Sequence, residues 1–314
     1  MRYLAGPLIA ATLLAGDVGT DSVQFHYECT FGSKFGIHPP KISNKRFAVA
    51  ATGESDHPYG LGFPEGVATD LNDRVWITDS GTASVHVFDR ATGAYREIRR
   101  AGDFTLVRPS GIASDSQGRI YVVDSELANV FVFEDGEYMR ALVKRGQHTL
   151  THPTAIAFSE NQRTIYVADP PRNLIVALDR EGEVDGTISL TEATREPCAI
   201  SVVNNQVYVL GARQHRVEIF SPAGVRRGEL RWEDIPLPLA FTFDDSHHRF
   251  LVANPRRMVV EVFGADQRGI GAFGQLGSRV DQQERIECVY VDRRGLVYLV
   301  DSHHGKVVVF REMK

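Results

Sequence analysis

The stretch Pro109 to Phe133, PSGIASDSQGRIYVVDSELANVFVF, contains three short apolar runs separated by polar turn clusters. The runs, at 111–113, 120–123 and 130–133, are rich in β-branched and aromatic residues, which favour β-strands. Pro109 stands where the first strand would begin, and there a missing backbone N–H costs least. The stretch therefore predicts three successive antiparallel strands.

The same arrangement recurs along the chain from residue 60 onward. Each copy has one residue that marks the end of its second apolar run. These markers are Asp79, Asp124, Asp169, Gly211, Asn254 and Asp301. They are 42 to 47 residues apart, which suits a four-stranded unit of about 40–50 residues and is longer than the common helical repeats. Six such units, with no helical pattern between them, predict an all-β fold: a six-bladed β-propeller of four-stranded antiparallel blades.

Two of these units carry a family resemblance. PSGIASDSQGRIYVVDSELANVFVF and PTAIAFSENQRTIYVADPPRNLIVALD resemble NHL repeats, and the resemblance extends over residues 45–314. It implies a six-bladed propeller, a fold found in protein- and RNA-binding modules, in bacterial sensor-kinase ectodomains and in a few lyases. The zinc-binding histidines, arginine and tyrosine of the family's amidating lyases have no match here. Because one fold serves many functions, the resemblance predicts architecture more than activity.

The first residues have the composition of a targeting segment. Residues 1–16, MRYLAGPLIAATLLAG, combine one positive charge at Arg2 with a short apolar run and small residues. This is typical of a secretory signal peptide, and the run is shorter than the roughly 20 residues of a membrane span. We therefore expect an exported protein of bacterial type, periplasmic or extracellular, with no transmembrane span in the mature chain. A first strand or a misassigned start is the alternative.

The remaining chain divides into an extended leader, residues 17–44, and the propeller, residues 45–314. The sixth unit has sequence for only three strands, because four residues follow Phe310. The apolar segment 46–52 precedes the first unit, and pairing it with 307–310 would supply the missing strand. We therefore predict a ring closed by an N-terminal strand at 46–52.

One rim of the predicted propeller is rich in cations. It carries the starts of the first strands and the loops between the second and third strands. The candidate binding residues in these loops are Arg172, Arg213, His215, Arg216, Arg256, Arg257, His304 and Lys306. Clustered arginines can grip carboxylates or phosphates through paired N–H donors; the alternative is that each arginine is merely solvated. We predict a non-enzymatic scaffold that docks a protein or an anionic small molecule on this rim.

Other partners are disfavoured by composition. The net charge is −5, and the cationic loops lack the interleaved aromatic residues that stack on bases, which argues against nucleic acid. We expect a monomer without a cofactor. The recurrent aspartates are predicted to accept hydrogen bonds from the N–H groups of their own turns. Three cysteines cannot all pair, and Cys198 and Cys288 are expected to be small core residues at corresponding positions.

The residue after each strand-opening proline, or the aligned residue in the sixth unit, which lacks the proline, is predicted to lie near the axis. These positions are Glu65, Ser110, Thr154, Cys198, Leu239 and Glu287. An alternative function follows from them: a metal-dependent lyase or hydrolase at the channel mouth, with Glu65, Glu287 and an overhanging His303 as catalytic residues. Metal sites on propellers normally draw ligands from several blades. We therefore prefer the interpretation without catalytic residues and without a metal.

Overall fold

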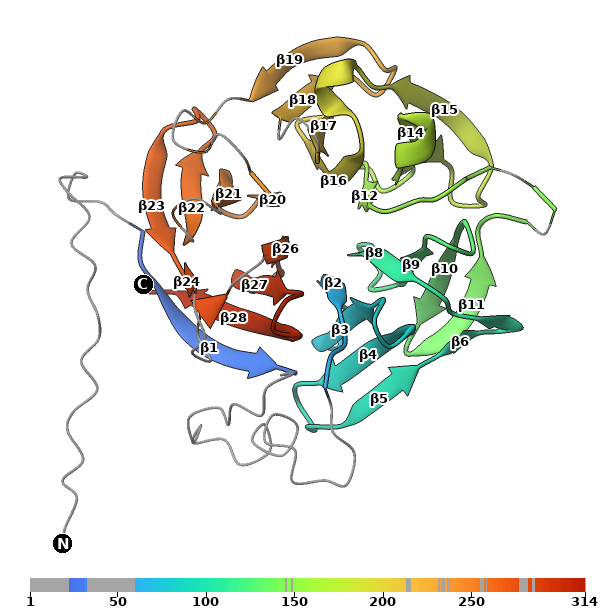
Figure 1. Cartoon of the computed structure of the whole chain (residues 1–314), viewed down its shortest axis with the longest axis horizontal. Coiled ribbons are helices and arrows are strands. Elements are labelled where there is room, and N and C mark those ends of the chain that lie inside the picture. Colours follow the sequence, from blue (N-terminus) through green and yellow to red (C-terminus); the bar gives the residue numbers. More distant parts are fainter. Residues whose placement is uncertain are drawn as a thin grey trace, which may run out of the picture.

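The computed structural model describes residues 23–32, 60–144, 146–147, 149–212, 216–230, 232, 235, 238–254, 257, 259–276, 282–283 and 286–313. These residues form six four-stranded antiparallel sheets, arranged as blades around a central axis (Figure 1). Their helical content is limited to two short 3₁₀ turns, η1 (Pro170–Arg172) and η2 (Glu192–Thr194). The predicted all-β, six-bladed architecture is confirmed.

In each blade the first strand lies nearest the axis and the later strands lie progressively further out (Figure 1). The first strands are β2 (Pro64–Thr69), β8 (Pro109–Ser114), β12 (Ile156–Phe158), β16 (Pro197–Val203), β20 (Phe241–Asp244) and β26 (Ile286–Val291). The second strands are β3 (Arg74–Asp79), β9 (Ile120–Asp124), β13 (Ile165–Asp169), β17 (Gln206–Gly211), β21 (Arg249–Asn254) and β27 (Leu296–Asp301). The second strands are buried on both faces by neighbouring blades, which explains their continuous apolar runs.

The outer half of each blade follows the same order. The third strands are β4 (Ser84–Asp89), β10 (Asn129–Glu134), β14 (Leu174–Leu178), β18 (Arg216–Phe220), β22 (Val259–Gly264) and β28 (Lys306–Glu312). The outermost strands are β5 (Tyr95–Ile98), β11 (Glu137–Ala141), β15 (Val184–Ser189), β19 (Arg226–Leu230), β23 (Gly269–Phe273) and β1 (Phe25–Phe31). Two short pairs lie between blades: β6 (Arg100–Ala101) with β7 (Phe104–Thr105), and β24 (Gln275–Leu276) with β25 (Gln282–Gln283).

The ring is closed by an N-terminal strand, as predicted, but by a different segment. Strand β1 pairs antiparallel with β28, from Phe25 opposite Glu312 to Phe31 opposite Val307. It therefore pairs with the edge of blade six that was predicted to pair with residues 46–52, and those residues lie outside the described ones. The prediction of an extended leader over residues 17–44 is therefore wrong for residues 25–31, which form strand β1.

A β-bulge explains why the sequence of β1 lacks the alternation that is typical of a strand. The register shifts between Tyr27 and Cys29, so the residues on either side of the bulge face different blades. Phe25 stacks on Phe273 of blade five at 4.0 Å between ring centroids. Phe31 packs against Phe88 of blade one at 5.0 Å. The bulge interrupts the alternation by which a strand is recognised, and it lets β1 join the two ends of the ring.

The carboxylate at the end of a second strand holds two segments of backbone together. Asp124 is fully buried and accepts hydrogen bonds from the N–H groups of Val107 (2.8 Å), Arg108 (3.1 Å) and Leu127 (3.1 Å). The last of these is the predicted bond within the turn, which is confirmed. The other two also fix the chain where it enters the blade. Asp79 accepts both sets of bonds. Asp169 accepts those from the entering chain, at Thr151 and His152, but in its own turn it is bonded by the Arg172 side chain and not by a backbone N–H as predicted.

Two blades replace this aspartate. In blade four, a Cβ on Gly211 would lie 2.5 Å from Thr194 Cα, so the close approach of η2 leaves no space for a side chain. Glu218, on the neighbouring strand β18, instead accepts hydrogen bonds from Thr191 and Thr194 (2.6 and 2.8 Å). In blade five, Asn254 donates to Glu261 (2.6 Å), which occupies the same position as Glu218.

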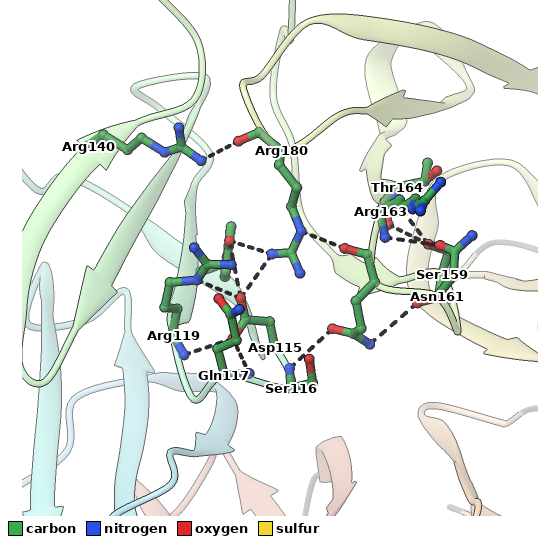
Figure 2. A network of polar contacts seen from close by, with 12 residues as sticks. Asp115, Ser116, Gln117, Arg119, Arg140, Ser159, Asn161, Arg163, Thr164 and Arg180 are labelled. Carbon is green, nitrogen blue, oxygen red and sulfur yellow. Dashed lines mark hydrogen bonds and ion pairs between the residues drawn. The ribbon is translucent and has the colours of Figure 1, made fainter.

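On the far rim, which carries the turns between first and second strands, charged side chains connect neighbouring blades (Figure 2). Arg180 of blade three contacts Asp115 (2.9 Å) and the Tyr121 hydroxyl (2.5 Å) of blade two. Burial alone would raise the pKa of Asp115, but the hydrogen bonds from Arg119 and Arg180 outweigh it and lower that pKa. Arg90 makes the corresponding contact with Tyr298 at the junction of blades one and six (2.8 Å).

Removal of the closing strand should weaken the whole ring. We expect deletion of residues 1–32 to lower the free energy of unfolding by at least about 3 kcal/mol, because losing one buried phenylalanine such as Phe31 already costs about 3–5 kcal/mol. Deletion of residues 1–22 keeps β1 and is the control. Urea unfolding followed by tryptophan fluorescence measures both. Superimposable curves for the two deletions would show that β1 does not close the ring.

Candidate functional site at the channel mouth

The first strands begin, and the second strands end, at the same rim. Pro64 pairs with Asp79, Pro109 with Asp124, and Pro197 with Gly211. The loops between second and third strands therefore share one rim with the starts of the first strands, as predicted. We call this surface the mouth rim.

Two of the predicted binding arginines are engaged by buried carboxylates. Arg172 donates from Nε to Asp169 Oδ2 (2.8 Å) and from Nη2 to the Thr149 carbonyl (2.6 Å). Arg257 donates from Nη1 to Glu261 Oε1 (3.1 Å). Because charge-assisted hydrogen bonds to buried carboxylates are strong, these two side chains support their own loops.

Arg216 differs from them. Its Nη1 lies 3.9 Å from Glu229 Oε2, beyond hydrogen-bonding distance, and half of the side chain is exposed. It therefore keeps its donors turned to solvent. The neighbouring candidates Arg213, His215 and Arg256 lie outside the described residues.

The last two predicted binding residues are not on the surface. Lys306 is 3% exposed and His304 is 9% exposed. The His304 Nδ1 lies 2.8 Å from Asp301 Oδ2, within the turn of blade six. His303 is exposed, and its ring lies edge-on to that of His304 at 5.2 Å between centroids. In this arrangement neither His304 nor Lys306 presents its charge to a partner.

Sequence reasoning missed Arg108. It directly precedes the strand-opening Pro109, so it belongs to the chain entering blade two and not to a loop between second and third strands. Half of its side chain is exposed, and its Nε lies 3.7 Å from Glu65 Oε1 of blade one. The position before the proline is the signal that could have revealed it. The equivalent residues in blades one, three and four are Phe63, His152 and Glu196.

The predicted axial hydroxyls connect blades. The Ser110 hydroxyl lies 2.9 Å from that of Ser125, which donates to the Pro153 carbonyl of blade three (2.6 Å). Thr154 donates in turn to the Pro197 carbonyl of blade four (3.1 Å). Ser110 and Thr154 lie where the innermost strands begin, as expected, but this network bonds to the next blade.

Glu65 is the axial residue with the most perturbed environment. Burial raises the pKa of its carboxyl group, and the nearby charges of Glu287 and Asp79 add to this, against Ser80 and Arg108. Its Oε1 is buried without a hydrogen-bond partner among the described residues. The structure thus brings Glu65 and Glu287 close enough to interact electrostatically. Ser302 donates a hydrogen bond to Glu287 (3.0 Å).

Cys198 and Cys288 do not occupy corresponding positions. Pro197 and Ile286 open their strands at equivalent places, so Cys198 aligns with Glu287, and Cys288 comes one residue later. Cys198 reaches solvent, contrary to the expected core position, yet surrounding protein atoms raise the pKa of its thiol to about 12, and the Glu287 charge contributes. A thiol of this pKa is a poor nucleophile at neutral pH.

The described residues do not assemble a metal site. Among them, no group of three histidine, cysteine, aspartate or glutamate side chains is placed to hold an ion. Glu65 and Glu287 are therefore a carboxylate pair, and no described contact brings His303 to them. We derive no chemistry through a metal.

Comparisons with known proteins agree with this architecture. The NHL repeat family matches residues 106–133, and no curated protein matches the chain. Virginiamycin B lyase from Staphylococcus aureus aligns with 91% of this chain and 99% of its own, at 9% identity and a TM-score of 0.60. XC5397 from Xanthomonas campestris, described as a gluconolactonase, aligns with 81% of this chain and 87% of its own, at 13% identity and 0.62. A Bacteroides thetaiotaomicron protein of unknown function aligns with 81% of this chain and 70% of its own, at 13% identity and a TM-score of 0.63.

At these identities the solved structures show the fold alone, which is that of a β-propeller. The described residues form a six-bladed propeller, and one segment of it, residues 106–133, matches the NHL repeat family. Within the described ranges, no helix has the length and apolar character needed to cross a bilayer.

The environment of Glu65 predicts a pH-dependent effect of its substitution. A carboxyl group whose pKa is raised by folding contributes stability that is complete below its unfolded pKa, about 4.3, and is lost as pH rises through the folded pKa. Glu65→Gln stays neutral throughout. We therefore expect the melting temperature of the variant, relative to wild type, to increase from pH 4 to pH 7.

The control is Glu126→Gln, which changes a half-exposed glutamate on the same rim. Its difference from wild type should be similar at both pH values. A Glu65→Gln difference that stays constant or decreases with pH would contradict the inferred burial of this carboxyl group.

Proposed function

We propose that this protein is a non-enzymatic binding scaffold that docks a protein or an anionic ligand on its mouth rim. The observation that carries the proposal is the state of the rim arginines. Arg216 and Arg108 are half exposed and lie 3.9 and 3.7 Å from their nearest carboxylates. Their guanidinium groups therefore retain donors for an incoming carboxylate or phosphate.

The fixed backbone at Arg108 and Arg216 supports docking. The backbone at Arg108 is fixed by Asp124, and the strand that begins at Arg216 is paired with Gly211. A preorganised surface loses little conformational freedom on binding, so more of the contact energy appears as affinity. Arg172 and Arg257, whose donors are engaged, stabilise their own loops on the same rim.

The location and assembly are parts of the same proposal. Residues 1–16 lie outside the described residues, and their composition supports export to the periplasm or the extracellular space. We propose that the mature protein acts there as a monomer, without a cofactor. The net charge of −5 makes nucleic acid an unfavourable partner.

Anion docking through Arg216 can be tested with a short fluorescent polyglutamate peptide. We expect Arg216→Gln to weaken binding about fivefold in fluorescence anisotropy, as for the loss of one exposed charge contact worth about 1 kcal/mol. Arg96→Gln is the matched control, because Arg96 is equally exposed but lies on the outer strand β5. Equal weakening by both variants, or no binding to wild type, would count against docking at this rim.

A second candidate function is a lyase or hydrolase at the channel mouth. The observation in its favour is Glu65, because a buried carboxyl group with a raised pKa is suited to general acid catalysis. The similar propellers include a gluconolactonase and a lyase bound to quinupristin. Our preferred function predicts that the purified protein opens neither gluconolactone nor quinupristin in assays of several hours. Turnover that Glu65→Gln abolishes would favour the enzyme.

A further inference from the structure

The chain that leads into strand β1 crosses the outer edge of blade five. The N–H of Val23 donates to the carbonyl of Ile270 in β23, the outermost strand of that blade (3.2 Å). A Cβ placed on Gly271, the next residue, would lie 2.9 Å from the Val23 carbonyl oxygen and 3.3 Å from the Val23 nitrogen. Glycine is needed at this position because another stretch of backbone passes directly over it.

A β-bulge defines the place of this contact. The register of β22 with β23 shifts between Gly269 and Gly271, so Ile270 is the extra residue and lies outside the ladder. Its carbonyl is thereby left for a partner outside the sheet, and Val23 is that partner. We call a bulged residue on an outermost strand, together with the glycine that follows it, an edge notch.

Blade four has the same edge notch, and no described segment crosses it. The register of β18 with β19 shifts between Arg226 and Gly228, so Arg227 is the bulged residue and Gly228 corresponds to Gly271. No described atom lies within 4 Å of a Cβ placed on Gly228, and the φ of this glycine is not in the left-handed region. Neither packing nor conformation in the described chain therefore requires a glycine here, although glycine weakens the interior of a strand. A glycine in such a position often marks the approach of another backbone.

Blade three also has an edge notch, but in a different setting. Asp185 is its bulged residue and Gly186 follows. The turn of blade four approaches this edge, because a Cβ on Gly224 would lie 3.3 Å from the Thr187 carbonyl oxygen. The exposed side chain at the bulge is thus an aspartate in blade three and an arginine in blade four. Of the notches in blades three to five, only that of blade four combines an open glycine with a positive charge.

The surroundings of the blade-four notch are cationic and partly apolar. Arg227 is exposed, and among the described residues no carboxylate pairs with it. Val225, two residues earlier, is 53% exposed. Arg226 is different, because it donates to Glu218 and lies 3.2 Å from Glu229. An available guanidinium group beside the notch favours a segment that carries a carboxylate side chain.

We propose that the edge notch of blade four binds an extended, acidic segment of a partner polypeptide. The partner adds a strand to β19, which is the outermost strand of its blade (Figure 1). A backbone N–H of the partner donates to the Arg227 carbonyl, the partner backbone passes over Gly228, and a carboxylate side chain pairs with the Arg227 guanidinium. In strand addition the main-chain bonds supply affinity and the side chains supply specificity. This surface lies on the circumference of the ring, so it does not depend on docking at the mouth rim.

Three fluorescein-labelled hexapeptides test this chemistry in fluorescence anisotropy. The first is Glu-Val-Ser-Val-Glu-Val, the second has lysine in place of glutamate, and the third is the glutamate peptide with every backbone nitrogen methylated. We expect the glutamate peptide to bind about fivefold more tightly than either of the others, as for one hydrogen bond or one exposed charge contact. Equal binding of the methylated peptide, or no binding of the glutamate peptide, would overturn strand addition. Equal binding of the lysine peptide would overturn the acidic occupant.

A variant at the notch locates the site. Gly228→Val should weaken binding of the glutamate peptide about fivefold, because the new side chain blocks the approach of another backbone. Its melting temperature should not decrease, since the side chain has room and valine favours strands. Gly186→Val makes the equivalent change in blade three and is the matched control, with unchanged peptide binding expected. Unchanged peptide binding in folded Gly228→Val would overturn the proposal.

The contact in blade five, on which the proposal is based, can be tested separately. Gly271→Val should lower the melting temperature, because the backbone of Val23 leaves no room for a side chain. An unchanged melting temperature would remove this precedent and count against the proposal. Peptide binding that is lost in Arg216→Gln but kept in Gly228→Val would place the peptide on the mouth rim, and it would overturn the site at the edge of blade four.

Discussion

A buried carboxylate at the end of the second strand is the interaction on which the propeller depends. In blades one and two it accepts backbone N–H groups from two places: the turn that follows it and the chain that enters the blade. In blade three Asp169 accepts them from the entering chain. An unpaired buried N–H costs more free energy than a made hydrogen bond contributes. The carboxylate therefore decides where each innermost strand begins, and it fixes the mouth rim to which the candidate binding residues belong.

The replacements in blades four and five show that the requirement is for the acceptor and not for one residue. Glu218 and Glu261 occupy equivalent places on the third strands. Glu218 accepts hydrogen bonds from Thr191 and Thr194 in the chain that enters blade four, and Glu261 accepts one from Asn254 at the end of the second strand. His86 stands at this place in blade one, where its Nε2 lies 3.0 Å from Thr82 Oγ1. The position opposite the middle of the second strand therefore acts as a second source of support for the rim.

The sequence was sufficient for the blades because each blade is a local structure. Its strands follow one another with short turns, and the period of the repeat can be recognised despite departures such as Gly211. The closing strand is different, since β1 pairs with a strand almost 300 positions away and a bulge at Tyr27 breaks its alternation. Nothing local to residues 25–31 indicates that partner. Periodicity therefore predicted that a strand was needed but selected the wrong one.

The candidate site was predictable only in part for a related reason. Loop composition identified the cationic rim, but whether an arginine is available depends on which carboxylate lies opposite it. Arg172 and Arg257 are engaged by residues three and four positions away, whereas Arg108 meets Glu65 across a blade boundary. Ser125 and Thr154 likewise bond to carbonyl groups of the next blade, which their own repeat does not contain. Contacts between blades have no signature within one repeat.

The pairing of β1 with β28 also bears on how the protein is made. During synthesis β1 leaves the ribosome before every other described strand, and β28 leaves after every other one. Blades one to five can each form from neighbouring hairpins as they emerge, because their contacts are local. Strand β1 has no partner until synthesis of the ring is nearly complete, and its apolar side chains, Phe25 and Phe31 among them, stay uncovered for that time. Such a strand is what holdase chaperones recognise, so joining of the two chain ends is the step at which a nascent chain of this protein most needs protection from aggregation.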